Sequence, residues 1–214
     1  MSVDNMLGRS RDPREKRTLQ RLTDAVLALA AEQDITQVSV AELTRRAEIN
    51  RSTFYAFAAS PVEWLTSVLH AELDAARRVT TNELSESGSL TRDIMRQTLS
   101  RLLDHVERHQ SVYTGTQRSS SRFALRIVLA EHVENSVLQA FHDGFIDPPV
   151  EKPTFESMSA SFLGHGIAGL VEVWMRLPAP RDRLMLFNTL EEMYPVWFAP
   201  KPAGFAGEAP RDTS

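Results

Sequence analysis

The sequence predicts an all-α protein with about nine helices. Apolar residues recur at the three- and four-residue spacing of an amphipathic helix in one segment after another, and no alternating strand pattern competes with them. Stretches rich in Pro, Gly or Ser at residues 85–89, 147–149 and 178–180 separate the longer segments. The hydrophobic content of 42% and the charged content of 24% are those of a globular chain that buries a core.

The first helix is expected over about residues 14–33, where apolar side chains recur at helical spacing. These side chains are Leu19, Leu22, Val26 and Leu29. Ser39 and Glu42 then match a capping box, in which the serine accepts a backbone N–H and the glutamate reaches back to the cap. A short second helix follows the box and ends near Ala47.

A tight connection leads to Asn50, which is a good N-cap for a third helix over residues 51–57. Ser60 and Pro61 suit the start of a fourth helix, because serine caps helices and proline fits the first turn. The apolar stripe of this helix extends toward Val79. The first part of the chain is therefore expected to contain four helices.

Further helical patterns cover about residues 90–109, 119–143, 154–177 and 181–198. We divide the chain into a head (1–60) with a basic N-terminal arm, a helical body (61–199) and a tail (200–214). The Pro/Gly/Ala composition of the tail cannot bury a core, so we expect the tail to be disordered.

The charge distribution favours a nucleic-acid partner although the net charge does not. The net charge of −4 alone argues against nucleic acid. Residues 1–21, however, carry six basic and three acidic side chains, and the rest of the chain sums to −7. Attraction to phosphate depends on the local patch rather than on the total, so the N-terminus is the expected contact.

The composition also excludes several classes of protein. The chain has no cysteine, which excludes disulfides, thiolate zinc sites and a cysteine nucleophile. Residues 1–21 contain no apolar core of a signal peptide, and no later stretch approaches the roughly 18 apolar residues of a membrane span. We expect a soluble cytoplasmic protein without a membrane partner.

The second and third helices have the organisation of a helix-turn-helix unit, whose second helix enters the major groove of DNA. Its first turn faces bases and phosphates, so the side chains best placed to touch DNA follow the Asn50 cap. They are Arg51, Ser52, Thr53 and Tyr55. Phe54 is expected to face inward, with Val40, Leu43 and Ile49. A capped helix pair that serves only packing is the alternative.

The N-terminal segment closely resembles the signature of TetR-family transcriptional regulators over about residues 14–70. The matching residues are Leu22, Ala25, Leu29, Ala30, residues 38–43 and residues 47–55. The resemblance implies a homodimer on a palindromic operator, with a ligand-controlled helical body above the two DNA-binding heads.

The resemblance also implies roles for single positions. Ser39 matches a hydroxyl that often binds phosphate, and Asn50 matches the cap of the recognition helix. Basic residues of the arm and of the second helix are expected on the DNA backbone, where each neutralised phosphate adds a salt-dependent contribution. The DNA-binding candidates are Arg17, Arg21, Ser39, Arg45, Arg46, Asn50, Arg51, Ser52, Thr53 and Tyr55. The alternative for the arm is a merely solvated charged terminus.

The sequence departs from the family pattern at three places. The usual glycine near Asp34 is missing, so the chain must turn there in another way. The usual aromatic pair after Tyr55 is replaced by Phe57 and Ala58, which alters the core. Pro61 replaces a lysine that commonly binds phosphate, and we expect the basic arm to compensate.

The run from Gly164 to Gly169 matches the dinucleotide-binding glycine pattern, but it lies inside a helical stripe rather than between a strand and a helix. We interpret its small residues as allowing close helix contact. By the resemblance, the last two helices form the dimer seam. The seam would combine this run with Leu186, Leu190, Met193 and Trp197.

His105 and His109 are four residues apart, a spacing that can hold a metal on one helical face. The spacing of the intervening glutamate is not that of a zinc protease, so we interpret both as surface or pocket-lining residues. No motif for nucleophilic, phosphate-transfer or paired-carboxylate catalysis is legible. We therefore expect no metal, no cofactor and no enzymatic activity.

The resemblance places a small-molecule effector, of unknown identity, among the middle helices. Residues that would line its pocket are His109, Tyr113, Phe123, Phe162 and Trp174. The alternative for each of these residues is that it simply fills the core. The sequence as a whole favours a repressor that its effector releases from DNA. An activator, or a regulator that binds no small molecule, would have the same sequence features. Rival hypotheses are a helical enzyme or binding protein with a non-functional head, and a protein-interaction module.

Overall fold

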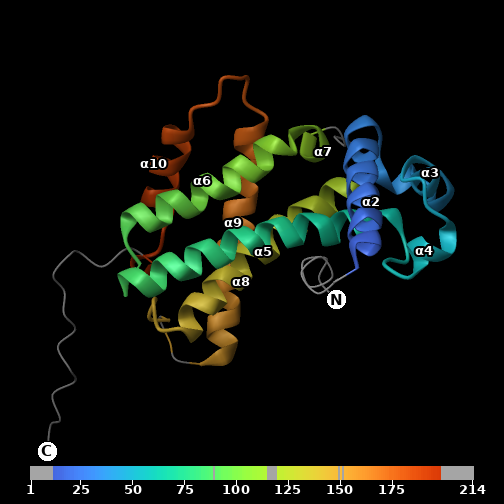
Figure 1. Ribbon diagram of the computed structural model, residues 1–214. Coiled ribbons are helices and arrows are strands. Elements are labelled where there is room, and N and C mark those ends of the chain that lie inside the picture. The colour runs from blue at the N-terminus through green and yellow to red at the C-terminus, as the bar shows by residue number, and fades with distance from the viewer. Residues whose placement is uncertain (1–11, 89, 115–119, 149, 151, 199–214) are drawn as a thin grey trace, which may run out of the picture.

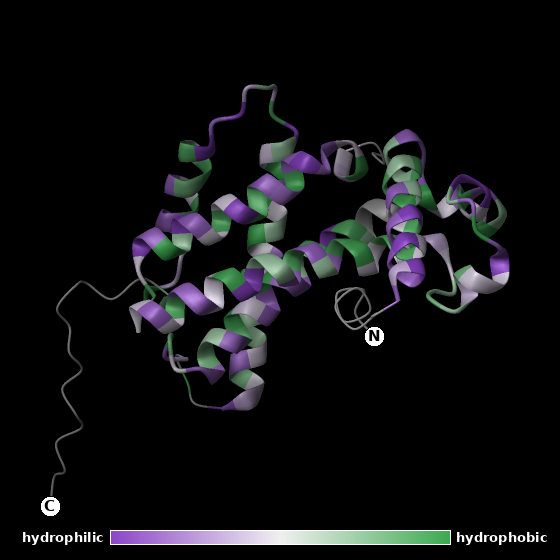
Figure 2. Cartoon of the chain, viewed as in Figure 1, coloured by the Kyte–Doolittle hydropathy of each residue, from purple (hydrophilic) through white to green (hydrophobic). Residues whose placement is uncertain are grey.

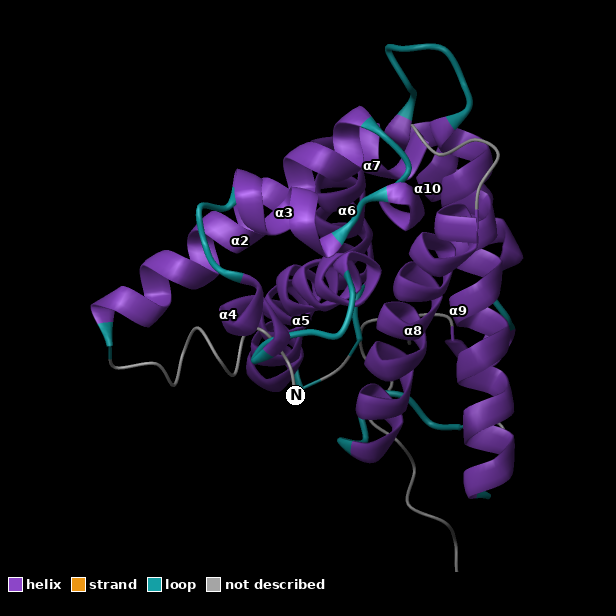
Figure 3. Cartoon of the chain, turned by 90° about the vertical axis from the view of Figure 1, so that its right-hand side faces the viewer, coloured by secondary structure: helices purple, strands orange, loops and turns teal. Residues whose placement is uncertain are grey.

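The computed structural model describes residues 12–88, 90–114, 120–148, 150 and 152–198. Within this described part the chain forms nine α-helices, two short 3₁₀ helices and no strand (Figure 3). The predicted all-α class is confirmed. Most of the basic arm and all of the tail lie outside the described residues.

The head consists of α2 (Pro13–Glu32), the 3₁₀ helix η1 (Ile35–Gln37), α3 (Val40–Arg46) and α4 (Arg51–Tyr55). These elements gather at one end of the molecule (Figure 1). The buried face of α2 contains the apolar residues that predicted it, so the helix packs by its stripe. The α4 helix ends two residues earlier than expected.

The body is built around one long helix, α5, which runs from the head along the length of the molecule (Figure 1). It packs against α2 in the head and against α6 and α8 in the body. The body helices are α5 (Pro61–Ser87), α6 (Arg92–Arg108), α7 (Gln110–Thr114), α8 (Ser120–His142), α9 (Pro153–Met175) and α10 (Arg183–Met193), followed by η2 (Val196–Phe198). Hydrophobic and hydrophilic residues alternate along these helices, as expected where one face is buried (Figure 2).

Two helix ends in the body differ from the sequence prediction, and one short helix was not predicted. The α5 helix continues to Ser87 and ends at Gly88, whose left-handed φ of 70° suits a glycine C-cap. The short α7 was not expected, because five residues are too few for a periodic pattern. The α10 helix stops at Met193, before Pro195.

The departures from the family pattern have local structural solutions. Asp34 starts η1 by accepting the backbone N–H of Thr36 at 3.0 Å, so an aspartate-capped turn takes the place of a glycine turn. The Phe57 ring lies 6.1 Å from the buried Trp64 ring. Pro61 occupies the first turn of α5 and is itself buried.

The α8 and α9 helices lie side by side in both views (Figures 1 and 3) and make the largest helix contact of the body. The glycine run lies inside α9, as expected. A Cβ atom on Gly164 would lie 2.5 Å from the carbonyl oxygen of Ala130 in α8. A Cβ on Gly166 would meet nothing within 4 Å. Gly164 therefore permits close contact within the chain, whereas Gly166 lies on the outer side of α9.

No helix of the described part is both long enough and apolar enough to cross a bilayer.

We expect Gly164→Ala to lower the free energy of unfolding, measured by urea denaturation at fixed protein concentration. The new methyl group collides with backbone, and such overpacking costs about 1–3 kcal/mol or more. This cost exceeds the gain of about 1 kcal/mol that alanine brings to a helix. Ser157→Ala, at an exposed position of the same helix, is the control and leaves stability within about 0.5 kcal/mol. An unchanged or higher stability of the Gly164 variant would contradict the close packing.

Candidate nucleic-acid interface

The α3 helix and the turn after it position the third helix of the head. Ser39 caps α3 by accepting the backbone N–H of Glu42 at 3.1 Å. The Glu42 carboxylate, expected to reach back to the cap, accepts instead from the side-chain amide of Gln33 at 2.9 Å. Glu48 adopts a left-handed φ of 53°, which is unusual for a residue with a side chain. The direction of α4 is therefore set by a tight turn that contains no glycine.

Asn50 organises the first turn of α4 through a single oxygen. Its Oδ1 accepts the backbone N–H of Thr53 at 2.7 Å, the Thr53 hydroxyl at 2.8 Å and the Ser52 hydroxyl at 2.7 Å. Each hydroxyl has one proton, and here that proton points to Asn50. Ser52 and Thr53 are therefore prepared to accept a hydrogen bond from a base amino group, whereas a phosphate contact requires the hydroxyl to rotate.

The two sides of α4 have opposite character. Phe54 is completely buried, and so is Leu43 of α3 behind it. Tyr55 is 59% exposed, and its ring meets the edge of Phe54 at 5.6 Å between centroids. The inward orientation predicted for Phe54 is confirmed. An aromatic anchor thus holds a helix whose outer side carries hydroxyl and phenol groups.

The basic candidates divide into exposed and ion-paired residues. Arg45 and Arg51 are exposed. Arg46 makes two hydrogen bonds of 2.6 Å to Glu32, which lower the pKa of that carboxyl and raise the pKa of Arg46. Exposed ion pairs contribute little to stability, so a phosphate can compete with Glu32 for the guanidinium.

The residues of α2 add less positive charge than the sequence suggested. Arg21 lies 3.5 Å from Glu48, and Arg17 donates to the Pro13 carbonyl at 3.2 Å. Residues 12–60 contain seven Lys or Arg and seven Asp or Glu. Any attraction to phosphate in this part of the head must therefore come from the local grouping of arginines near α4, not from its total charge.

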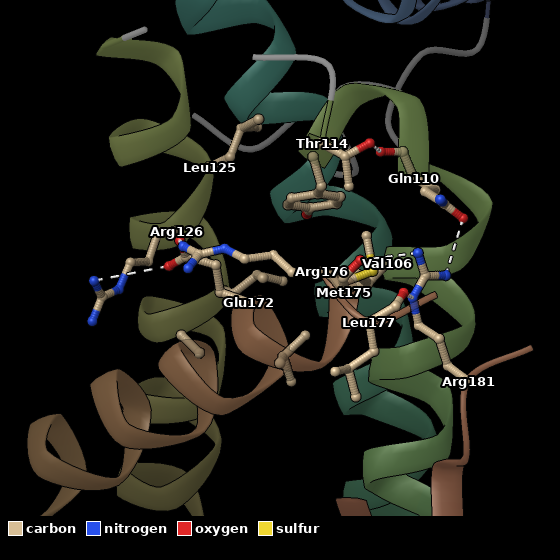
Figure 4. Close-up of a pocket in the computed structure, with 14 residues that line it drawn as sticks. Val106, Gln110, Thr114, Leu125, Arg126, Glu172, Met175, Arg176, Leu177 and Arg181 are labelled. Carbon is tan, nitrogen blue, oxygen red and sulfur yellow. Dashed lines mark hydrogen bonds and ion pairs between the residues drawn. The ribbon is translucent and has the colours of Figure 1, made fainter. Parts of the chain in front are cut away.

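A cavity of about 370 Å³ opens in the body between α6, α7, α8 and α9 (Figure 4). Its charged groups are three arginines and Glu172, and Gln110, Tyr113 and Thr114 add further polar groups. Glu172 pairs with Arg176 and, at 3.9 Å, with Arg126. Arg181 lies 3.4 Å from the amide oxygen of Gln110. The apolar wall includes Val106, Leu125, Leu129, Ala168, Val171, Met175 and Leu177. The cavity combines apolar walls with guanidinium groups at its edge, and sequence reasoning had not singled out these arginines.

Only one of the expected pocket residues with a described side chain lines this cavity, namely Tyr113. Trp174 is packed in the core, where its N–H donates to the Asp182 carbonyl at 3.1 Å. Phe162 is 69% exposed on the outer side of α9. His109 belongs to a separate cluster, and the side chain of Phe123 lies outside the described residues. His109, Phe162 and Trp174, which were predicted to line the effector pocket, therefore do not line this cavity.

The interpretation of His105 and His109 as surface residues is wrong, because both are buried and hydrogen-bonded to Glu72. Neither lines the cavity described above. Burial raises the pKa of Glu72, but the hydrogen bonds from the two histidines outweigh it and hold this pKa well below its usual value. Burial lowers the pKa of His105. Glu72 was missed because it is far from both histidines in sequence, on α5.

Comparison with known proteins identifies the architecture. No family model and no curated protein sequence matches this chain significantly. Similar solved structures include the fatty acid degradation regulator FadR from Bacillus halodurans and a TetR-family transcriptional regulator from Streptomyces coelicolor. The first has a TM-score of 0.56 at 13% identity and covers 85% of this chain and 94% of its own. The second has a TM-score of 0.51 at 15% identity and covers 83% and 78%.

The chain has an all-α, TetR-like fold. Both alignments extend over most of the 214 residues, so the likeness includes head and body. The predicted second and third helices are present as α3 and α4, joined by a short turn. At 13–15% identity the likeness concerns the fold alone.

We expect Asn50→Ala to lower the free energy of unfolding by about 1 kcal/mol, because loss of an N-cap side chain typically costs about 0.5–2 kcal/mol. The measurement is chemical denaturation followed by circular dichroism. Asn82→Ala, at an exposed asparagine inside α5 and away from its N-cap, is the matched control and should not be destabilised. Equal stabilities of the wild type and the Asn50 variant would mean that the cap does not hold α4.

Proposed function

We propose that this chain is a transcriptional regulator that binds operator DNA through α4. The observation that carries the proposal is the two-sided character of α4, with Phe54 buried and Tyr55 exposed beside the Asn50 cap. A helix that only packs has no need of an exposed aromatic hydroxyl next to ordered serine and threonine hydroxyls. Such an edge suits the major groove, where base edges offer both donors and acceptors.

In this proposal the recognition helix reads bases while arginines contact the backbone. Arg51 opens α4, and Arg45 lies at the end of α3, both with exposed side chains. Ser39, at the start of α3, is exposed and offers a phosphate contact at a helix N-terminus. Arg46 also contacts the DNA backbone when a phosphate replaces Glu32 as the partner of its guanidinium.

We propose further that two copies associate through the outer sides of α9 and α10. These helices expose apolar side chains that a monomer leaves in water: Phe155, Met158, Phe162, Val173, Leu184, Met185 and Met193. Large apolar side chains exposed in such number on two helices are more typical of an interface than of a free surface. Gly166 adds a position without a side chain on α9, which favours close approach of a second helix.

The expected composition of the seam needs correction. Leu186 and Leu190 are 3% and 2% exposed, because they pack into the core of their own chain. The Trp197 ring lies at a tilt to the Phe141 ring of its own chain, with 5.7 Å between centroids. Among the residues near the C-terminus that were expected in the seam, Met193 is 62% exposed and can contact a second copy.

The cavity supports the proposal of a small-molecule effector. Tyr113 and Thr114 of α7 line the cavity, and α7 also packs against α2 of the head. A ligand that favours one position of α7 therefore changes the position of the head, which is the differential interaction that regulation requires. We propose that the effector releases a repressor in this way.

Tyr55→Ala should weaken binding to an operator selected from a random duplex pool by about tenfold or more, since a lost base contact costs roughly 1–3 kcal/mol. The chain should stay folded, because the side chain is 59% exposed. Fluorescence anisotropy at two salt concentrations measures the affinity and its ionic component. Tyr55→Phe is the matched variant that separates the ring from the hydroxyl. Unchanged operator affinity in the alanine variant, or failure to select any operator, would contradict DNA recognition by α4.

Phe162→Glu should convert the dimer to a monomer at micromolar concentration, because it places two carboxylates in an apolar interface. Sedimentation equilibrium measures the association. Val79→Glu, at an apolar position of α5 that is 47% exposed, controls for the added charge and should leave the dimer intact. A wild-type chain that sediments as a monomer would exclude the seam, as would a dimer in which the Phe162 substitution has no effect.

A further inference from the structure

Three side chains that the proposed function does not use converge between the head and the middle of the body. Glu72 comes from α5, His105 from the last turn of α6, and His109 from the C-cap of α6. One carboxylate oxygen of Glu72 lies 3.2 Å from His105 Nδ1 and 2.8 Å from His109 Nε2. The histidines are 4% and 8% exposed, so the cluster is largely shielded from solvent.

We propose that Glu72, His105 and His109 form a binding site for a divalent transition metal ion of the Zn²⁺ class. Two imidazole nitrogens and a carboxylate are a ligand set that zinc commonly takes, with a further position left for water. The three candidate ligand atoms all lie within 4.8 Å of one another. Tetrahedral zinc, with bonds of about 2.0–2.1 Å, separates its ligand atoms by about 3.4 Å, so small rotations of the side chains suffice.

The backbone places these ligands favourably for a cation. Because His105 and His109 are four residues apart, they lie on one face of the helix end, and α5 presents Glu72 to that face. The carbonyl end of a helix carries partial negative charge, and both histidines lie at the C-terminal end of α6. The geometry therefore concentrates negative potential where the three ligand atoms meet.

Tyr113 provides the second contact that metal-binding histidines usually have. Its hydroxyl lies 2.9 Å from His105 Nε2, on the side of the ring away from Glu72. A tyrosine hydroxyl both donates and accepts, so it can pair with either tautomer of the imidazole. Without metal, His105 donates from Nδ1 to Glu72 and accepts from Tyr113. With metal, Nδ1 becomes the ligand, and Nε2–H donates to the tyrosine oxygen.

Arg108 is the charge that opposes a cation at this place. Its guanidinium lies 3.4 Å from the same Glu72 oxygen, and its side chain is 65% exposed. The arginine can therefore turn into solvent when an ion takes the carboxylate. The Glu72 side chain is 31% exposed, which gives an ion a path from solvent to the cluster.

The test uses the full, tag-free chain after removal of metal with a chelator. Titration with Co²⁺, followed by its visible ligand-field absorption and by competition with Zn²⁺, should show one equivalent bound per chain. Glu72→Gln and His109→Gln should each weaken binding by 100-fold or more, and Tyr113→Phe should weaken it by about tenfold. Circular dichroism without metal verifies that these variants fold.

A complementary variant tests whether the other histidines bind the metal, and its result does not depend on the folding of the Glu72 and His109 variants. The triple variant His70→Gln/His142→Gln/His165→Gln removes the histidines that are not buried, and it should bind Co²⁺ as the wild type does. Absence of a saturable one-equivalent spectrum in the wild type would overturn the proposal. Loss of the spectrum in the triple variant, or its retention in folded Glu72→Gln and His109→Gln variants, would also overturn it. None of these measurements involves DNA, so they stand apart from the proposed function.

Discussion

The structure of the head depends on the burial of Phe54. A helix of five residues is too short to be stable alone, because helix nucleation is unfavourable and few hydrogen bonds follow it. Its position must therefore come from packing on one side and from the Asn50 cap at its start. Full burial of Phe54 fixes the rotation of α4, and that rotation decides that Tyr55 and the Ser52 hydroxyl face outward. The proposed recognition edge is the consequence of this one buried ring.

The long α5 helix extends this constraint to the body. Its first turns pack against α2, and the same helix carries Glu72 toward α6. A rigid helix that belongs to both parts moves the head when its body end moves. Its neighbour α7 makes a second connection, since it contacts α2 as well as α6 and α8. The η1 helix of the head also contacts α5 and α8. The head is therefore held to the body through α5, α7 and α8, and any rearrangement of these helices acts on it.

The parts of the structure that could be predicted are those governed by local sequence. Ser39, Asn50 and Ser60 cap their helices as expected, because an N-cap depends on contacts within three residues. The fold class followed from helical periodicity in the same way. The sequence showed that the chain must turn near Asp34 without a glycine, but it did not show that an aspartate-capped 3₁₀ turn would do so.

The parts that could not be predicted depend on which helix packs where. Glu72 is 33 residues from His105, and no periodic signal joins the two. The α9 helix has apolar residues on two sides, and only the tertiary structure distinguishes the side buried against α8 from the side that exposes Phe162. For the same reason, sequence could not separate Leu190, in the core, from Met193, at the surface.

Tyr113 links the two candidate sites of the body. Its ring lines the cavity, and its hydroxyl binds His105 of the Glu72 cluster. Burial raises the pKa of this phenol, so it remains a neutral hydroxyl that both donates and accepts. If both proposals hold, a ligand that displaces the ring changes the partner of His105, and a metal that reverses the His105 tautomer changes the hydroxyl facing the ligand. The two equilibria are then reciprocal, because each ligand alters the affinity of the other by the same factor. Since Tyr113 belongs to α7, which packs against α2, either event also acts on the head.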